Sequence, residues 1–127
     1  MLPLTVLVAD DHEDFRRVVH EFLDRLPNIS VVGEASNGKE AVAQVERLHP
    51  DIVLMDISMP LQNGLEATRI IKKRWPLTKV VIATMHDNPL YRSQAHEAKA
   101  DEFILKSTLK PNLVAALNSY TRETGVS

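Results

Sequence analysis

The feature that most constrains the fold is a regular alternation between short apolar runs and amphipathic stretches. Five apolar runs recur along the chain: LTVLVA (4–9), ISVVGEA (29–35), DIVLM (51–55), KVVIA (79–83) and EFIL (102–105). They are rich in β-branched residues, and their apolar positions are nearly continuous instead of alternating with polar ones. This pattern is typical of strands that are covered on both faces, as in a parallel sheet.

The stretches between these runs have the spacing of amphipathic helices. Apolar residues recur every three or four positions in 12–26, and Pro27 ends this segment. Similar patterns predict four further helices: one capped by Asn37, one that includes Leu65 and ends at Trp75-Pro76, one over 88–99 and one that begins near Pro111. Five β-α units joined by right-handed crossovers predict an α/β fold, a doubly wound parallel sheet with helices on both faces.

The length and composition fit one globular domain over 1–127, with 122–127 as a tail or the start of a linker. Of the 127 residues, 44% are apolar and 25% are charged, close to the average for globular domains. A net charge of −2 gives no electrostatic reason to expect nucleic-acid binding by this chain itself. The absence of Cys excludes disulfides and thiolate metal sites and fits a reducing, cytoplasmic location. No apolar run approaches the length of a membrane span, so we expect no membrane partner.

Polar residues that can carry chemistry follow four of the five runs. Asp10 and Asp11 follow the first run, Asp56 the third, Thr84 the fourth and Lys106 the fifth. Ligands of doubly wound sheets bind outside the carboxyl ends of the strands. We therefore expect three carboxylates, a hydroxyl and an ammonium group to converge on one rim of the sheet.

The chemistry of that set indicates a metal-dependent phosphoryl site. Three carboxylates within a few ångströms cannot all stay ionised unless a cation neutralises them. Hard oxygen ligands, without His or Cys at ligand spacing, favour Mg²⁺, with Mn²⁺ as the other possibility. An aspartate beside such a metal can act as a nucleophile in phosphoryl transfer, and a lysine and a hydroxyl can bind the transferred oxygens.

Each of these residues also has a simpler interpretation. Asp10 and Asp11 could cap the helix over 12–26, and Asp56 could open a turn. Thr84 and Lys106 could be ordinary groups at strand ends, although the occurrence of all of them on one rim favours the joint site. The histidines show no ligand spacing and are interpreted as surface residues: His12, His20, His49, His86 and His96.

Four stretches together resemble the receiver domain of two-component response regulators, over essentially the whole chain. They are LVADDHEDFRRVV, PDIVLMDISMPLQNGLEATRIIK, VVIATMHD and ADEFILK. The stretches DISMPLQNGLEATRIIK and TMHD are together most similar to bacterial receivers joined to LuxR-type helix-turn-helix output domains, the NarL/FixJ subfamily. The resemblance implies a flavodoxin-like (βα)5 fold with strand order 2-1-3-4-5.

The resemblance also implies a role for each residue on the rim. Asp56 would be the phosphoacceptor. The Mg²⁺ ion would be bound by Asp10 and Asp11, by Asp56 itself and by the backbone carbonyl of Ser58. Lys106 would contact one phosphoryl oxygen, and the phosphoryl group would come from a phosphohistidine on a sensor histidine kinase.

A switch is implied as well. Thr84 would hydrogen-bond another phosphoryl oxygen and move toward it, and Phe103 would rotate inward into the space that Thr84 leaves. Phe103 could instead be a plain core residue of the last strand. The change would alter the face formed by the fourth helix, fifth strand and fifth helix. A homodimer formed on phosphorylation would use that face or the face of the first and fifth helices.

The chain departs from the family pattern near the last strand and beside Thr84. Lys99 and Glu102 stand where glycine is frequent in the family, so we expect the entry to the last strand to be shaped differently. Met85 is larger than the residue that many receivers carry there, and it could narrow access to the phosphoryl group. His86 lies near the rim and could also tune access.

Other functions remain open at this stage. One is an Mg²⁺-dependent phosphatase with an aspartyl-phosphate intermediate, although strand one lacks the D-x-D of the haloacid-dehalogenase type. A flavin carrier is disfavoured because Asp10 and Asp11 would repel the flavin phosphate. A receiver that works without phosphate is disfavoured because all key positions are intact. The chain is not expected to be a conventional enzyme, and it could be a stand-alone receiver or part of a transcription regulator that contacts DNA through an output domain.

Overall fold

The computed structural model describes residues 3–123 and contains one parallel five-stranded sheet. Its strands are β1 (Leu4–Ala9), β2 (Ile29–Ala35), β3 (Ile52–Met55), β4 (Lys79–Thr84) and β5 (Glu102–Leu105). The order across the sheet is β2-β1-β3-β4-β5, and every neighbouring pair is parallel. The predicted α/β fold and strand order are therefore confirmed.

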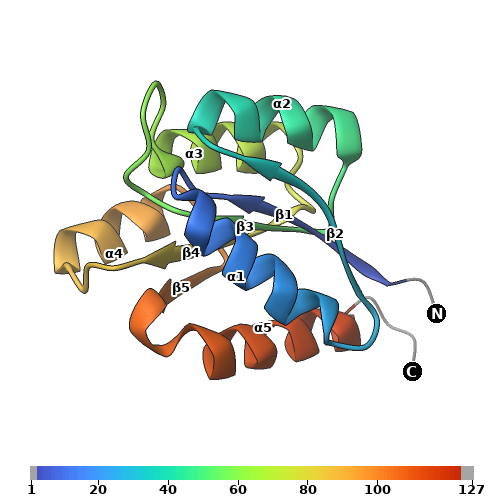
Figure 1. The fold of residues 1–127 in the computed structure, drawn as a ribbon. Coiled ribbons are helices and arrows are strands. Elements are labelled where there is room, and N and C mark those ends of the chain that lie inside the picture. Colours follow the sequence, from blue (N-terminus) through green and yellow to red (C-terminus); the bar gives the residue numbers. More distant parts are fainter. Residues whose placement is uncertain (1–2, 124–127) are drawn as a thin grey trace.

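Helices follow the strands and cover both faces of the sheet. They are α1 (Glu13–Asp24), α2 (Gly38–Leu48), α3 (Gly64–Arg74), α4 (Pro89–Glu97) and α5 (Leu109–Glu123), with a short 3₁₀ helix, η1 (Lys106–Thr108), between β5 and α5. In Figure 1, α1 and α5 lie on one side of the sheet, and α2 and α3 lie on the other. None of the described helices combines the length and the apolar character needed to cross a membrane.

The continuous apolar runs supply two separate core layers. Val6 and Val8 of β1 pack in a cluster with residues of α1 and α5, whereas Leu7 and Ala9 pack in a second cluster with residues of α2, α3 and α4. Successive side chains of a strand point to opposite faces. A strand buried on both sides therefore needs apolar residues at nearly every position.

Asparagine side chains cap the N-termini of three helices. Asn37 accepts a hydrogen bond from the Glu40 N–H at 2.8 Å, which confirms the predicted cap of α2. Asn63 accepts from the Glu66 N–H at 3.0 Å at the start of α3, and Asn88 accepts from the Leu90 N–H at 2.8 Å at the start of α4. Each side chain satisfies an N–H group that has no partner within the helix.

The structure gives the bounds of the last helix and of its surroundings. α5 begins at Leu109, directly after η1, so Pro111 lies in its first turn, which agrees with the predicted start near Pro111. The helical spacing does not bury every apolar side chain, because Val18 of α1 is 51% exposed and Leu90 of α4 is 59% exposed. α5 continues through Glu123, beyond the expected start of a tail at residue 122, and residues 124–127 lie outside the described part of the chain.

The turn before β5 keeps a conformation that glycine favours. Lys99 has φ of 68°, in the left-handed region where a side chain is strained. Its N–H donates to the His96 carbonyl at 3.0 Å, and the next N–H, of Ala100, donates to the Ala95 carbonyl at 3.0 Å. Lys99 therefore adopts a left-handed conformation that glycine would adopt without strain, and the expectation of a different shape at the entry to the last strand stays a prediction.

Candidate functional site

The carboxyl ends of the strands bring the predicted residues to one edge of the sheet. Ala9 is paired with Met55, so Asp10 and Asp56 follow adjacent strand ends. The Asp56 N–H donates to the Ala9 carbonyl at 2.9 Å, which fixes the two ends against each other. Thr84 ends β4 and pairs with Leu105, the residue before Lys106.

Two of the carboxylates are buried and share the ammonium group of Lys106. The Lys106 Nζ lies 2.6 Å from Asp10 Oδ2 and 3.6 Å from Asp56 Oδ1. Asp10 is 1% exposed and Asp56 is 5% exposed. Buried charges of this kind need a partner, and one lysine serves both.

The environment of Asp56 disfavours its charged form. Burial raises its pKa from the ordinary 3.8 to about 6, and the negative charge of Asp10 adds to the rise. The charge of Lys106 and a hydrogen bond from the Ile57 backbone oppose this effect without cancelling it. The edge of the sheet thus carries more negative charge than its own lysine neutralises.

Gly64 fixes the loop between Asp56 and α3. Its N–H donates to the Ile57 carbonyl at 2.9 Å, and a Cβ at this position would collide with the Asp56 carbonyl. The absence of a side chain therefore lets the start of α3 pack directly against the end of β3.

His12 is a surface residue, as predicted, with a side chain that is 68% exposed, and its ring also reaches the acidic cluster. Its Nδ1 lies 3.0 Å from Asp10 Oδ1 and 3.1 Å from Asp11 Oδ1. His12 also occupies the position that caps α1, and its N–H donates to Asp10 Oδ1 at 2.8 Å. The Asp10 carboxylate therefore binds the N–H of the first residue of the predicted helix 12–26, although His12 occupies the N-cap position of α1 and its side chain makes no capping hydrogen bond. The sequence feature that could have indicated this contact is the position of His12 directly after Asp10 and Asp11.

The donor groups fit a hard divalent cation. One ligand atom from each of Asp10, Asp11, His12 and Asp56 lies within 4.8 Å of the others. Three of these ligands are carboxylates, the ligand type that Mg²⁺ and Mn²⁺ prefer. Burial raises the pKa of Asp56, and the negative charge of Asp10 adds to the rise, so a cation at this place would stabilise the charged carboxylate. Ser58 is an exposed residue of the loop after β3, and the role of its carbonyl stays a prediction.

The remaining predicted residues lie on β4, β5 and the loop after β4. Thr84 is 2% exposed, and its hydroxyl oxygen accepts from the His86 N–H at 3.3 Å. Met85 is 74% exposed, and the exposed His86 ring lies 6.4 Å from the Tyr91 ring. Phe103 is half-buried against the α2-α3-α4 core layer, with the Arg92 guanidinium 4.6 Å from its ring centre.

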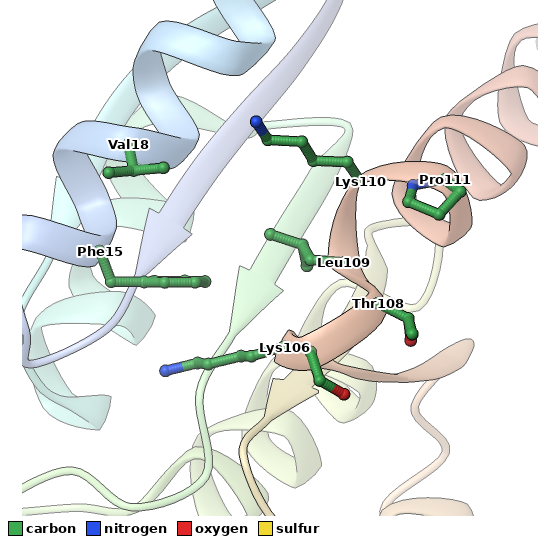
Figure 2. Close-up of a pocket in the computed structure, with 8 residues that line it drawn as sticks. Phe15, Val18, Lys106, Thr108, Leu109, Lys110 and Pro111 are labelled. Atoms are coloured by element: carbon green, nitrogen blue, oxygen red, sulfur yellow. The ribbon is translucent and has the colours of Figure 1, made fainter.

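A cavity lies beside Lys106, between α1 and the start of α5 (Figure 2). It has a volume of about 370 Å³, and its lining includes Phe15, Val18 and Leu109. The Lys106 Nζ lies 4.1 Å from the centre of the Phe15 ring, a distance at which an ammonium group is attracted to the ring face. Phe15 therefore helps to hold the lysine over the edge of the sheet.

Residues 6–118 match the family model described as the response regulator receiver domain. The chain belongs to this family. Its receiver fold is also similar to solved structures, including a two-component response regulator of the LuxR family from Aurantimonas sp., with 32% identity, a TM-score of 0.87, and coverage of 93% of this chain and 84% of that one. The receiver domain of the putative response regulator NarL from Mycobacterium tuberculosis has 29% identity and a TM-score of 0.87, with 96% and 98% covered.

Sequence relatives agree with the NarL/FixJ-like character of this receiver. The response regulator protein VraR of Staphylococcus saprophyticus is 38% identical over 125 residues, which is 96% of this chain and 59% of the relative. The transcriptional regulatory protein DegU of Brevibacillus brevis is 36% identical over 114 residues, which is 90% of this chain and 48% of the relative. The receiver thus spans about half to three-fifths of the length of these relatives.

Proposed function

We propose that this receiver accepts a phosphoryl group on Asp56, in a reaction that depends on Mg²⁺. The observation that carries the proposal is a buried Asp56 carboxylate beside Asp10, with the Lys106 Nζ 3.6 Å from its Oδ1. Asp10 and Asp11, Asp56 and the Ser58 carbonyl would hold the cation, with Mn²⁺ as a substitute. The cation would offset negative charge on the carboxylates and on the phosphoryl oxygens.

The proposed donor is a phosphohistidine of a sensor histidine kinase. An Asp56 carboxylate oxygen attacks phosphorus, the phosphorus–nitrogen bond breaks, and the leaving imidazole takes a proton. Lys106 is already next to Asp56 and would shift its ammonium group toward the transferred oxygens. Water can then attack the phosphorus, the bond from phosphorus to the Asp56 oxygen breaks, and inorganic phosphate leaves while the carboxylate is restored. The chain would thus catalyse its own modification without being a conventional enzyme.

Phosphorylation would be read out through Thr84 and Phe103. A new anion on Asp56 attracts the Thr84 hydroxyl, and the space that Thr84 leaves accepts the half-buried Phe103 ring. The surface of α4, β5 and α5 changes as a result, and Met85 and His86 would tune access to the group. Dimerisation through this face or through α1 and α5 is one possible readout.

The longer relatives suggest what lies downstream. One similar structure, with 27% identity and a TM-score of 0.85, is that of a DNA-binding response regulator of the LuxR family from Staphylococcus aureus, and DegU is a transcriptional regulatory protein. We therefore propose that this receiver acts in the cytoplasm and controls a DNA-binding output domain in a full-length protein. A stand-alone receiver that acts by protein contact is the alternative.

The test is intact-mass measurement after incubation with acetyl phosphate and MgCl₂. We expect a single phosphoryl adduct that disappears with EDTA and in Asp56→Asn, whereas Asp51→Asn, a matched change at an exposed aspartate, leaves it intact. An adduct that persists in Asp56→Asn would contradict the proposal. Steady hydrolysis of external phosphomonoesters by the unmodified chain would support a phosphatase instead.

A further inference from the structure

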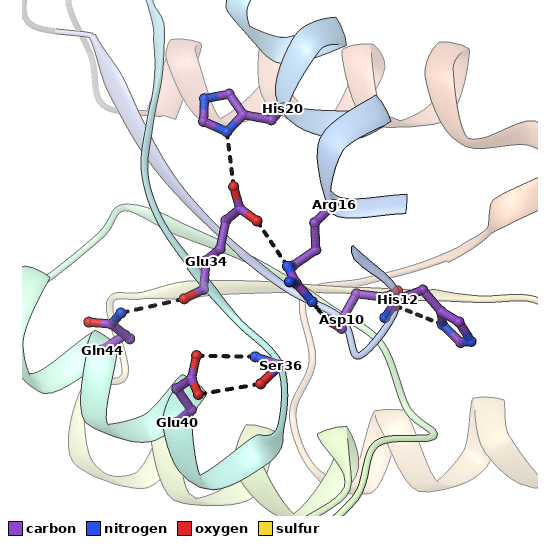
Figure 3. Close-up of polar contacts among 8 residues, drawn as sticks. All are labelled: Asp10, His12, Arg16, His20, Glu34, Ser36, Glu40 and Gln44. Carbon is purple, nitrogen blue, oxygen red and sulfur yellow. Dashed lines mark hydrogen bonds and ion pairs between the residues drawn. The ribbon is translucent and has the colours of Figure 1, made fainter. Parts of the chain in front are cut away.

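A partly buried arginine joins the acidic edge to the neighbouring strand (Figure 3). The Arg16 Nη1 donates to the Asp10 backbone carbonyl at 2.7 Å, and its Nε donates to Glu34 Oε1 at 2.9 Å. The Arg16 side chain is 17% exposed. One guanidinium group on α1 therefore connects the end of β1 to β2.

Arg16 supplies a donor where the strand ladder ends. The Asp10 N–H donates to the Ala35 carbonyl of β2 at 2.9 Å. The chain then turns toward α1, and the Asp10 carbonyl accepts from Arg16. A buried carbonyl without a donor is costly. Arg16 thus fixes the Asp10 backbone separately from the contacts of the Asp10 carboxylate.

Glu34 is well suited to anchor this arginine. Burial alone would raise the pKa of Glu34, but hydrogen bonds from His20 and Arg16 outweigh burial and lower its pKa. The second carboxylate oxygen of Glu34 lies 3.2 Å from the His20 Nδ1. Glu34 therefore carries a charge near neutral pH and holds the planar Arg16 group from one side while the Asp10 carbonyl holds it from the other.

The contribution of Arg16 is one of geometry more than of charge. The contacts of its guanidinium group are with the Asp10 backbone carbonyl and with Glu34, and none of them is with the Asp10 carboxylate. Asp11 and His12 follow Asp10 directly, so the orientation of the Asp10 carbonyl sets the course of the whole turn.

We propose that Arg16 is a positioning residue for divalent-cation binding: together with Glu34 it fixes the turn of residues 10–12 so that the Asp10 and Asp11 carboxylates face the same cation. This inference rests on the proposed function, because it takes the acidic cluster as the Mg²⁺ site. The groups that orient metal ligands commonly change metal affinity when they are replaced.

The experiment compares the Mg²⁺ dissociation constants of variants by calorimetric titration with MgCl₂. Arg16→Gln removes both contacts, Arg16→Lys keeps the charge but loses the two-pronged geometry, and Glu34→Gln weakens the anchor. Arg17→Gln is the matched control, because Arg17 is adjacent on α1, 61% exposed and paired with Asp14 at 2.9 Å. Circular dichroism at the titration temperature selects conditions in which every variant is folded.

We expect the dissociation constant for Mg²⁺ to rise about 10-fold or more in Arg16→Gln, which is the usual range for a group that orients metal ligands. Arg16→Lys should also bind more weakly than the unchanged chain, and Arg17→Gln should stay within about twofold of it, in line with the small effect of exposed pairs. The double variant Arg16→Gln/Glu34→Gln should bind no more weakly than Arg16→Gln alone, since both residues act through one contact.

Unchanged Mg²⁺ affinity in folded Arg16→Gln would overturn the inference, and so would an equal loss in Arg17→Gln. If Arg16→Gln does not fold, unchanged affinity in Arg16→Lys and Glu34→Gln would overturn it in the same way. If one of these results is found while Asp56 of the unchanged chain is still phosphorylated, the inference about Arg16 is overturned but the proposed function is not. An unchanged chain that binds no Mg²⁺ would overturn the proposed function and this inference together.

Discussion

Replacement of Asp56 by asparagine should stabilise the metal-free chain. The pKa of Asp56 is raised from 3.8 to about 6 by burial and by repulsion from Asp10. The difference is about 2 pKa units, and each corresponds to about 1.4 kcal/mol, so ionisation of Asp56 in the folded chain costs up to about 3 kcal/mol. Asparagine keeps the shape of the side chain without this charge.

The pH dependence gives the sign of the effect. The folded chain binds the Asp56 proton more tightly than the unfolded chain, so the contribution of Asp56 to stability is fully present below pH 3.8 and is lost as pH rises through about 6. Asp56→Asn lacks this loss. The difference in the free energy of unfolding between Asp56→Asn and the unchanged chain should therefore be small near pH 4. It should widen up to about pH 7 and stay constant above that pH.

The assay is urea unfolding in EDTA at several pH values between 4 and 8. At pH 7.5 we expect Asp56→Asn to be more stable by about 1 to 3 kcal/mol, which moves the midpoint by about 1 M urea. Asp14→Asn, at a carboxylate that is 89% exposed, should lack this gain. Saturating MgCl₂ should narrow the gap, because it binds the folded unchanged chain. An Asp56→Asn variant with no gain in stability, or with a gain that ignores pH, would refute the reasoning.

Two substitutions that introduce or remove a glycine give further tests. Lys99→Gly should stabilise the chain by about 1 kcal/mol in urea unfolding, because Lys99 has φ of 68° and glycine adopts that region without strain; a loss of stability would contradict this. Gly64→Ala should destabilise the chain by about 2 kcal/mol or more and slow labelling of Asp56 by acetyl phosphate, because the new methyl group collides with the Asp56 carbonyl. Unchanged stability and labelling in Gly64→Ala would show that the loop can move freely, against the packing described for it.

The fold and the edge that carries the candidate site could be predicted because they depend on simple periodicities. Strand ends in a parallel sheet align, so the first polar residue after each apolar run identifies the edge without any knowledge of side-chain contacts. Asp10, Asp56 and Lys106 were found in this way, and the structure brings their charged groups together.

What could not be predicted depends on register and on local strain. The contact from Arg16 to Glu34 requires the pairing of β1 with β2, which contains an irregularity between Val6 and Leu7. His12 is on the surface as predicted, but its contact with Asp10 and Asp11 could not be predicted, because it depends on how the turn folds its ring back onto them. At Lys99 the hydrogen bonds of the turn override the preference of the residue type.

The contact between Lys106 and Asp10 joins residues 96 positions apart and has a consequence for folding order. β1 and β5 are separated in the sheet by β3 and β4, so the lysine reaches the acidic pair only after the last strand has docked. Contacts of such long range form late and slow the search for the native topology. During synthesis, β1 to β4 would assemble with Asp10 and Asp56 facing each other without this ammonium group. Docking of β5 therefore completes the sheet and relieves the repulsion between Asp10 and Asp56 in one step. Competence for signalling would thus depend on completion of the fold.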